Sequence, residues 1–129
     1  MTYMQLKKLE IQGFKTFVDP VSFNFEFPIV AIVGPNGSGK SNIVDAVKWC
    51  MGEQSARQLR ANQMSDLIFN GSEHRKSIGM AEVSLAFTSN GIGGALPDDP
   101  FSEAVVTRRM YRGEESEYYL PLFYDGKCL

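Results

Sequence analysis

The stretch IVAIVGPNGSGKS, residues 29–41, decides how the chain folds. Its first five residues form a short apolar run without alternation, which is typical of a strand buried on both faces of a sheet. The glycines end that run, and Gly52 stands where a following helix should end. Between these points the hydrophobic residues recur at helical spacing, at Ile43, Ala46, Val47, Cys50 and Met51. The sequence therefore predicts a buried strand, a glycine-rich turn and a helix in succession.

Residues 34–41 match the pattern G-x-x-x-x-G-K-[ST] at every fixed position. Because glycine has no side chain, the loop can curl until its backbone N–H groups point at phosphate oxygens, and the helix adds its positive N-terminal end. Lys40 supplies a point charge for the β- and γ-phosphates, and the Ser41 hydroxyl is placed to bind Mg²⁺. We expect a nucleotide-phosphate site formed by Pro35, Asn36, Gly37, Ser38, Gly39, Lys40 and Ser41.

Hydrolysis needs more than a phosphate loop, because a carboxylate at the end of a strand must complete the Mg²⁺ shell. The candidates at Asp66, Asp98 and Asp125 lack an uninterrupted run of four apolar residues before the acid. Asp45 lies one helical turn beyond Ser41, within reach of the metal shell, but an acid on a helix surface is more often solvated, and that is what we expect here. The sequence therefore supplies no complete set of catalytic residues.

The remaining hydrophobic patterns predict strands over residues 6–14, 21–25 and 81–87, and a hairpin with strands 104–112 and 117–124. Residues 53–78 are polar and show no clear period, and residues 90–100 read as a surface loop. We expect an α/β P-loop lobe with a mixed sheet, one helix behind the P-loop and an antiparallel hairpin region.

Composition limits the protein class but not the chemistry. With 129 residues and 43% hydrophobic content, the chain has the size of one small globular domain. It has no apolar run near the length of a membrane span and no secretory signal, and its two cysteines fit a reducing compartment. We therefore expect a cytoplasmic protein without a membrane partner. A net charge of −2 does not by itself indicate binding to nucleic acid.

Several strings follow one another in the order of one family. They are GFKTF at 13–17, VGPNGSGKSN at 33–42, DAVKW at 45–49, GEQSARQLR at 52–60 and IFNGS at 68–72. Together they resemble the N-terminal half of the ATPase head of bacterial chromosome-partition SMC (structural maintenance of chromosomes) proteins. The resemblance extends from about residue 6 to residue 119, and the end of the chain from Leu120 to Leu129 diverges from it.

The resemblance implies ATP and Mg²⁺ as cofactors and adds Asn42 and Arg60 to the nucleotide site, with Lys15 as a further candidate near it. It implies that residues 1–129 form the P-loop lobe of a head whose signature motif and carboxylates lie in a C-terminal half. The fold is then incomplete, and the chain hydrolyses ATP only when that half is present. The implied partners are the C-terminal half, a second head in a homodimer, kleisin-type accessory subunits and DNA bound without sequence specificity. The implied role is chromosome condensation, organisation and segregation, at the nucleoid.

Three other interpretations remain open at this stage. A recombination or DNA-repair ATPase of the same superfamily shares the P-loop but not the GEQSA-x-x-LR string, whereas a small P-loop kinase needs an arginine-rich lid that this sequence does not show. The third is a binding module without activity.

Two clusters of basic residues are candidates for binding DNA phosphates. One comprises Arg57, Arg60, Arg75 and Lys76, and the other comprises Arg108, Arg109 and Arg112. Strand alternation places Arg108 and Arg109 on opposite faces, and ordinary solvated arginines explain either cluster equally well.

Overall fold

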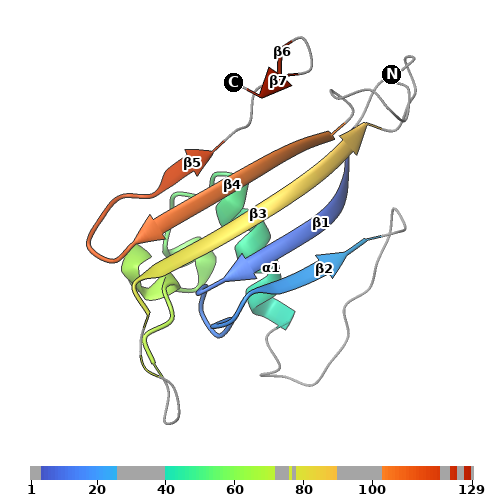
Figure 1. Ribbon diagram of the computed structural model, residues 1–129. Helices are drawn as coiled ribbons and strands as arrows, with labels where there is room; N and C mark the ends of the chain where they lie inside the picture. Colours follow the sequence, from blue (N-terminus) through green and yellow to red (C-terminus); the bar gives the residue numbers. More distant parts are fainter. Residues whose placement is uncertain are drawn as a thin grey trace.

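The structure is a computed structural model that describes residues 4–25, 40–71, 76, 78–89, 103–119, 123–124 and 127–128 (Figure 1). The predicted buried strand at 29–33, the glycine-rich loop at 34–39 and the predicted loop at 90–100 lie outside the described residues. The same holds for His74, which we expect at the surface, and for Arg75 of the first basic cluster.

A five-stranded sheet forms the body of the described structure, with the strand order β2-β1-β3-β4-β5. Each pair of neighbours in this sheet is antiparallel. The strands are β1 (Met4–Gln12), β2 (Val21–Asn24), β3 (Met80–Ser89), β4 (Glu103–Tyr111) and β5 (Glu117–Tyr119). The predicted strands at 6–14, 21–25, 81–87 and 104–112 are therefore confirmed, with shifts of a few residues at their ends.

The last predicted strand, 117–124, is wrong as a single element. Among the described residues of this stretch, Glu117–Tyr119 pair with β4. β6 (Phe123–Tyr124) instead pairs with β7 (Lys127–Cys128) in a separate two-stranded sheet. Pro121 between the two pieces has no backbone N–H, so it cannot donate to a neighbouring strand.

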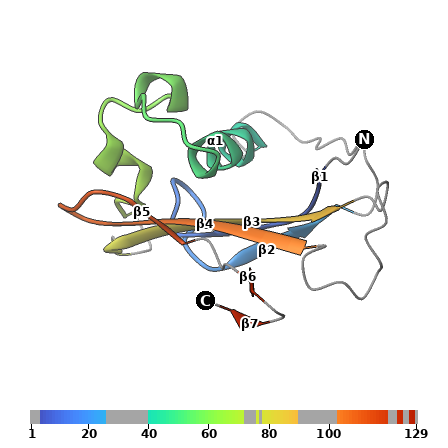
Figure 2. The same cartoon turned by 90° about the horizontal axis from the view of Figure 1, so that it is seen from above.

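The helix α1 (Lys40–Cys50) lies across one face of the sheet, as predicted. Figure 2 shows α1 and the two short 3₁₀ helices on the same side of the sheet. These are η1 (Arg57–Leu59) and η2 (Met64–Leu67), and they fill the region where the sequence shows no period. Gly52 follows α1 with a φ of 114°, which confirms its expected role at the helix end. No helix in the described part of the chain is long and apolar enough to span a membrane.

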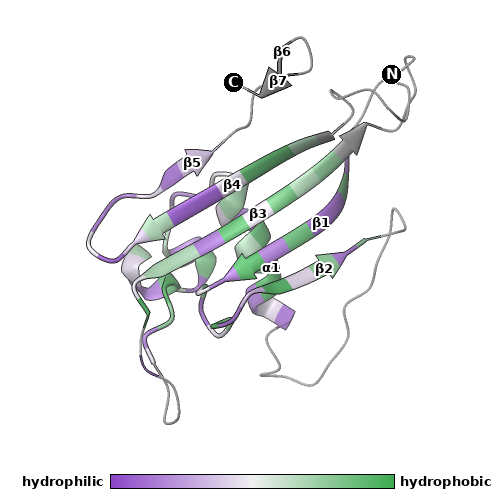
Figure 3. Cartoon of the chain, viewed as in Figure 1, coloured by the Kyte–Doolittle hydropathy of each residue, from purple (hydrophilic) through white to green (hydrophobic). Residues whose placement is uncertain are grey.

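The hydrophobic core lies between α1 and the sheet. Alternate residues of β1 and β3 point to this side, and Figure 3 shows the resulting alternation of hydrophobic and hydrophilic positions along both strands. Its buried members on these elements are Leu9, Ile11, Ile43, Ala46, Trp49, Cys50, Ala81, Val83 and Leu85. Cys50 packs in the core as expected. Trp49 is fully buried and packs between Phe14 and Arg108.

The turn after β1 brings the next residues to the N-terminal end of α1. It requires Gly13, whose φ is +69° and whose position leaves no room for a Cβ atom, which would lie 2.0 Å from the Met80 carbonyl oxygen. Backbone hydrogen bonds then tie this turn to the segment after η2, from Lys15 N to Leu67 O and from Phe69 N to Gly13 O. The turn and the 3₁₀ region are thereby fixed to each other.

Candidate nucleotide-binding site

The predicted phosphate motif ends inside the first turn of α1. The helix begins at Lys40, so Lys40, Ser41 and Asn42 all stand at its N-terminal end. The backbone N–H groups of a first turn have no acceptor within the helix, and this turn contains no acidic residue to offset their positive charge. Ser41 is exposed, so its hydroxyl is accessible to a ligand. Pro35, Asn36, Gly37, Ser38 and Gly39 lie outside the described residues.

Asp45 lies one turn further along α1, and the expectation that it is solvated is wrong. Its side chain is only 4% exposed, and its Oδ2 atom accepts hydrogen bonds from two cationic side chains. The Lys15 ammonium lies 2.7 Å from Oδ2, while Arg60 donates through Nε at 2.9 Å and through Nη2 at 2.6 Å. The turn after β1 and the segment after η1 cover this carboxylate, and both bring a positive charge to it.

The two cations reach Asp45 from an unusual backbone conformation. Lys15 and Arg60, with φ values of 53° and 55°, are the non-glycine residues with positive φ in the described structure. Such a conformation costs a residue with a side chain roughly 1–2 kcal/mol. Lys15 also donates from Nζ to the carbonyl oxygen of Leu59, next to Arg60. Local backbone strain is therefore maintained where charged side chains converge, which is a pattern found at binding sites.

Asn42 connects the same residues across the surface. Its Nδ2 donates to Thr16 Oγ1 at 3.0 Å, and its Oδ1 accepts from Arg60 Nη2 at 3.0 Å. The structure thus brings together Asn42 and Arg60, two of the residues expected at the nucleotide, with Lys15, the further candidate near it. All three border a hollow of about 580 Å³. The other polar residues that line it are Thr16, Asn62, Asp66 and Asn70.

Sequence reasoning missed the central position of Asp45 in this arrangement. A weak signal was present, because Asp45 is four residues after Ser41 and therefore on the same face of α1. Its partners are 30 and 15 residues away in the sequence, so no local pattern could reveal them.

The second basic cluster is divided in the way strand alternation predicts. Arg108 is 1% exposed and donates to the carbonyl oxygens of Trp49 at 2.7 Å and Glu53 at 2.8 Å. Its guanidinium lies between the rings of Trp49 and Tyr118, 4.8 Å and 4.9 Å from their centroids. Burial lowers the pKa of Arg108. Arg108 therefore caps the C-terminal end of α1 and is not available to DNA phosphates.

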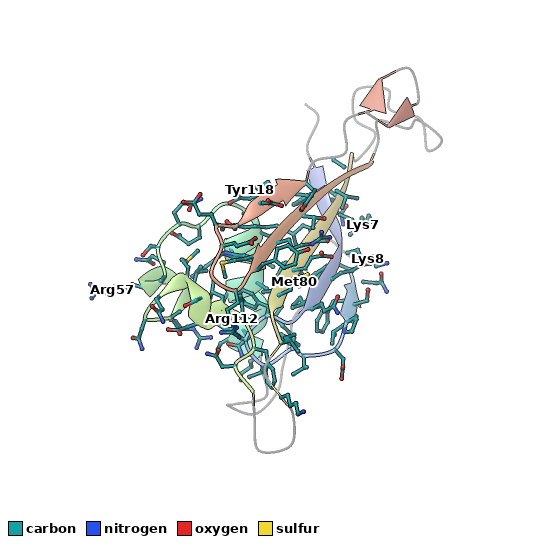
Figure 4. The ribbon with its side chains drawn as sticks, turned by 60° about the vertical axis from the view of Figure 1, so that its left-hand side comes forward. Lys7, Lys8, Arg57, Met80, Arg112 and Tyr118 are labelled. Carbon is teal, nitrogen blue, oxygen red and sulfur yellow. The ribbon has the colours of Figure 1, made fainter. Side chains whose placement is uncertain are left out.

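The other arginines differ in how far they are engaged. Arg109, on the opposite face, forms an ion pair with Glu82, which raises the pKa of Arg109. Arg112 donates to Asn70 Oδ1 and to the carbonyl oxygens of Phe69 and Ile78. Figure 4 shows Arg57 projecting outward from η1, and it is exposed. Arg57 and Arg112 are both exposed, but Arg112 is engaged in these hydrogen bonds, so among the described arginines of the two clusters Arg57 is the best placed for an external phosphate.

The comparisons with known proteins place the chain in a family. Residues 5–127 match the RecF/RecN/SMC N terminal domain. The chain belongs to this family. Its curated relatives include the chromosome partition protein Smc of Myxococcus xanthus and that of Bacillus subtilis, each 50% identical. Both matches cover 91% of this chain and 10% of the relative, so the chain spans about a tenth of the length of these relatives.

Solved SMC heads share the fold. A structure from a study of ATP-driven dimerization and DNA-stimulated activation of SMC ATPases is 39% identical, with a TM-score of 0.78 over 97% of this chain and 72% of that one. The Smc head of Pyrococcus furiosus bound to the C-terminal domain of ScpA is also 39% identical, with a TM-score of 0.79 over 98% of this chain and 30% of that one. RecF bound to ATP, at 19% identity and a TM-score of 0.65, shows a common fold only. The expected fold class, the N-terminal lobe of an SMC-type P-loop head, is confirmed.

Proposed function

We propose that this chain is the ATP-binding N-terminal part of an SMC head that acts in chromosome condensation, organisation and segregation. The observation that carries the proposal is the start of α1 at Lys40, inside a complete phosphate-binding motif. Similarity to Smc proteins over 91% of the chain favours this function over a recombination ATPase or a small kinase.

The residues at the N-terminal end of α1 fit a nucleotide triphosphate. The helix end, Lys40, Arg60 and Lys15 supply positive charge, and Asp45 is the one acidic partner that Lys15 and Arg60 share among the described residues. Lys15, Arg60 and Asp45 together therefore keep one net positive charge, while the Asp66 carboxylate, which borders the same hollow, accepts hydrogen bonds from Gln63. Anionic phosphates are the ligands that such a helix end and such a charge favour.

The Ser41 hydroxyl at the same helix end fits Mg²⁺ that arrives with a nucleotide. Among the described residues no group of three or more His, Cys, Asp or Glu side chains could hold a metal ion by itself. Mg²⁺ in nucleotide sites is bound by one or two protein ligands together with phosphate oxygens and water. The Ser41 hydroxyl is the protein ligand that we assign to it, and the ion would neutralise charge on the phosphates.

The activity requires further protein segments. We propose that the C-terminal half of the head supplies the catalytic carboxylate, and that a second head engages this one in the presence of ATP. Kleisin binding is supported by solved Smc heads that carry domains of ScpA, and stimulation by DNA is a property named for SMC ATPases. A cytoplasmic location at the nucleoid agrees with these partners.

The test is to combine this chain with the C-terminal head segment encoded in the same genome and to measure ATP hydrolysis with and without DNA. We expect hydrolysis only when both segments are present, with a higher rate in the presence of DNA. Stable assembly of the two segments without hydrolysis under either condition would contradict the proposal. Phosphoryl transfer to a small acceptor by this chain alone would instead favour the kinase interpretation.

A further inference from the structure

Asp45 is the residue on which the charged side chains beside the hollow converge. Resting on the nucleotide site proposed above, we propose that Asp45 is a positioning residue for ATP. Its buried carboxylate holds Arg60 and Lys15 at the N-terminal end of α1, so that the Arg60 guanidinium is already in place to contact the nucleotide phosphates.

The cluster of Lys15, Arg60 and Asp45 carries more positive than negative charge. Two cations share one carboxylate oxygen, so one positive charge is left over in the cluster. The Lys15 side chain is 11% exposed, whereas the Arg60 side chain is 53% exposed. The surplus charge is therefore available on Arg60, at the surface of the hollow, while Lys15 is enclosed with the carboxylate.

The hydrogen bonds of Arg60 fix the orientation of its guanidinium. Arg60 uses Nε and Nη2 for Asp45, and Nη2 also donates to Asn42 Oδ1. The edge of the guanidinium that carries Nε and Nη2 is therefore turned to α1, where it contacts Asp45 and Asn42. None of the hydrogen bonds among the described residues uses Nη1, so the N–H groups on that nitrogen can serve a ligand.

The fixed orientation of Arg60 affects the free energy of binding. A long arginine side chain that is free in solution loses rotamer freedom when it contacts a ligand, and a side chain that is already held loses less. Holding Arg60 through one edge therefore strengthens a contact made by the other edge. Asparagine at position 45 keeps the shape of the side chain but removes the charge that attracts Arg60.

A simpler role for Asp45 predicts the opposite result. If its carboxylate only reduced the positive potential, the substitution Asp45→Asn would tighten the binding of an anion. Asp66 provides a matched control, because it borders the same hollow. In the described structure its carboxylate accepts from the backbone N–H and side-chain amide of Gln63 and not from either cation. Asp66→Asn removes one negative charge from the hollow without releasing Arg60.

The experiment is a double-mutant cycle on ATP affinity, with Mg²⁺ present, in this chain combined with the C-terminal head segment. We expect Asp45→Asn and Arg60→Ala each to weaken ATP binding about tenfold, the effect of losing one charge-assisted contact. The double variant should be no weaker than Arg60→Ala alone, and Asp66→Asn should not weaken binding. Effects that add in the double variant, or tighter binding by Asp45→Asn, would overturn the proposal.

Thermal unfolding separates a positioning role from a failure to fold. If Asp45→Asn does not fold, Asp45→Ser replaces it in the cycle, since it also removes the carboxylate that holds Arg60. Wild-type ATP affinity in a folded Asp45→Ser variant would then refute the positioning role. The outcome for Lys40→Ala distinguishes the two proposals. If Lys40→Ala binds ATP as the wild type does, both the nucleotide site and the role of Asp45 are refuted. If Lys40→Ala does not bind ATP but the effects of Asp45→Asn and Arg60→Ala add, only the role of Asp45 is refuted.

Discussion

Arg108 gives the most stringent test of how the described structure is held together. It is a buried cation without an acidic partner among the described residues, and it joins the C-terminal end of α1 to the β4–β5 hairpin. The substitution Arg108→Met keeps an unbranched side chain of similar length but removes all donors. The carbonyl oxygens of Trp49 and Glu53 then lose the guanidinium that binds them.

The magnitude follows from the contacts. Three short hydrogen bonds from the charged guanidinium, to the carbonyl oxygens of Trp49 and Glu53 and to Ser116 Oγ, contribute roughly 1.5–3 kcal/mol each, and two ring contacts add about 0.5–1 kcal/mol each, or about 5.5–11 kcal/mol together. Removing a buried charge offsets several kcal/mol of this sum, because its desolvation is no longer required. We expect a net loss of about 3 kcal/mol in the free energy of unfolding.

Urea unfolding, followed by tryptophan fluorescence, measures this loss, since Trp49 is the single tryptophan and packs on Arg108. Arg109→Met is the matched control on the same strand. The ion pair of Arg109 with Glu82 is partly exposed, so Arg109→Met should lower the free energy of unfolding by at most about 1 kcal/mol. Arg108→Lys retains the positive charge but not the planar guanidinium with its several donors. Its loss in the free energy of unfolding should lie between those of Arg108→Met and Arg109→Met. Equal losses for Arg108→Met and Arg109→Met would refute the assignment of Arg108 as the cap of α1.

Two further predictions concern other buried positions. Burial raises the pKa of the Cys50 thiol to about 11 from its ordinary value of 9.0, so the folded state holds this proton more tightly than the unfolded state. Stability should therefore fall as the pH rises from about 9 to about 11, and less steeply in Cys50→Ala, which pH-dependent urea unfolding can measure. An equally steep fall in Cys50→Ala would contradict this. Both glycines have positive φ, but a Cβ atom added at Gly13 would lie 2.0 Å from the Met80 carbonyl oxygen, whereas one added at Gly113 would meet nothing within 4 Å. Gly13→Ala should therefore lower stability by clearly more than Gly113→Ala. The Gly113 variant should lose about 1–2 kcal/mol in thermal or urea unfolding, and equal losses would refute the steric argument.

The elements with a strong hydrophobic period were predictable from the sequence. In β1, β3 and β4 one face meets the core and the other does not, so alternation is visible in the residues themselves. The helix α1 is amphipathic for the same reason, and Gly52 marks its end. The 3₁₀ helices η1 and η2 are too short to show a period, which explains why residues 53–78 could not be interpreted.

The part of the site that depends on distant contacts was not predictable. Asp45 looks like a surface acid of an amphipathic helix until Lys15 and Arg60 are brought onto it by separate segments. Arg108 looks like a member of a basic surface cluster until its burial against Trp49 is known. In both cases the charge of the residue is evident in the sequence, whereas its partners are set by the tertiary structure.

The central claim is that a triphosphate binds at the N-terminal end of α1, and Lys40 tests it most directly. The measurement is the affinity for ATP with Mg²⁺ of this chain combined with the C-terminal head segment. Lys48 is the control, since it is an exposed lysine in the last turn of the same helix. We predict that Lys40→Ala abolishes binding and that Lys48→Ala leaves it unchanged. Unchanged binding by Lys40→Ala, or an equal loss in both variants, would contradict the assignment of the phosphate site.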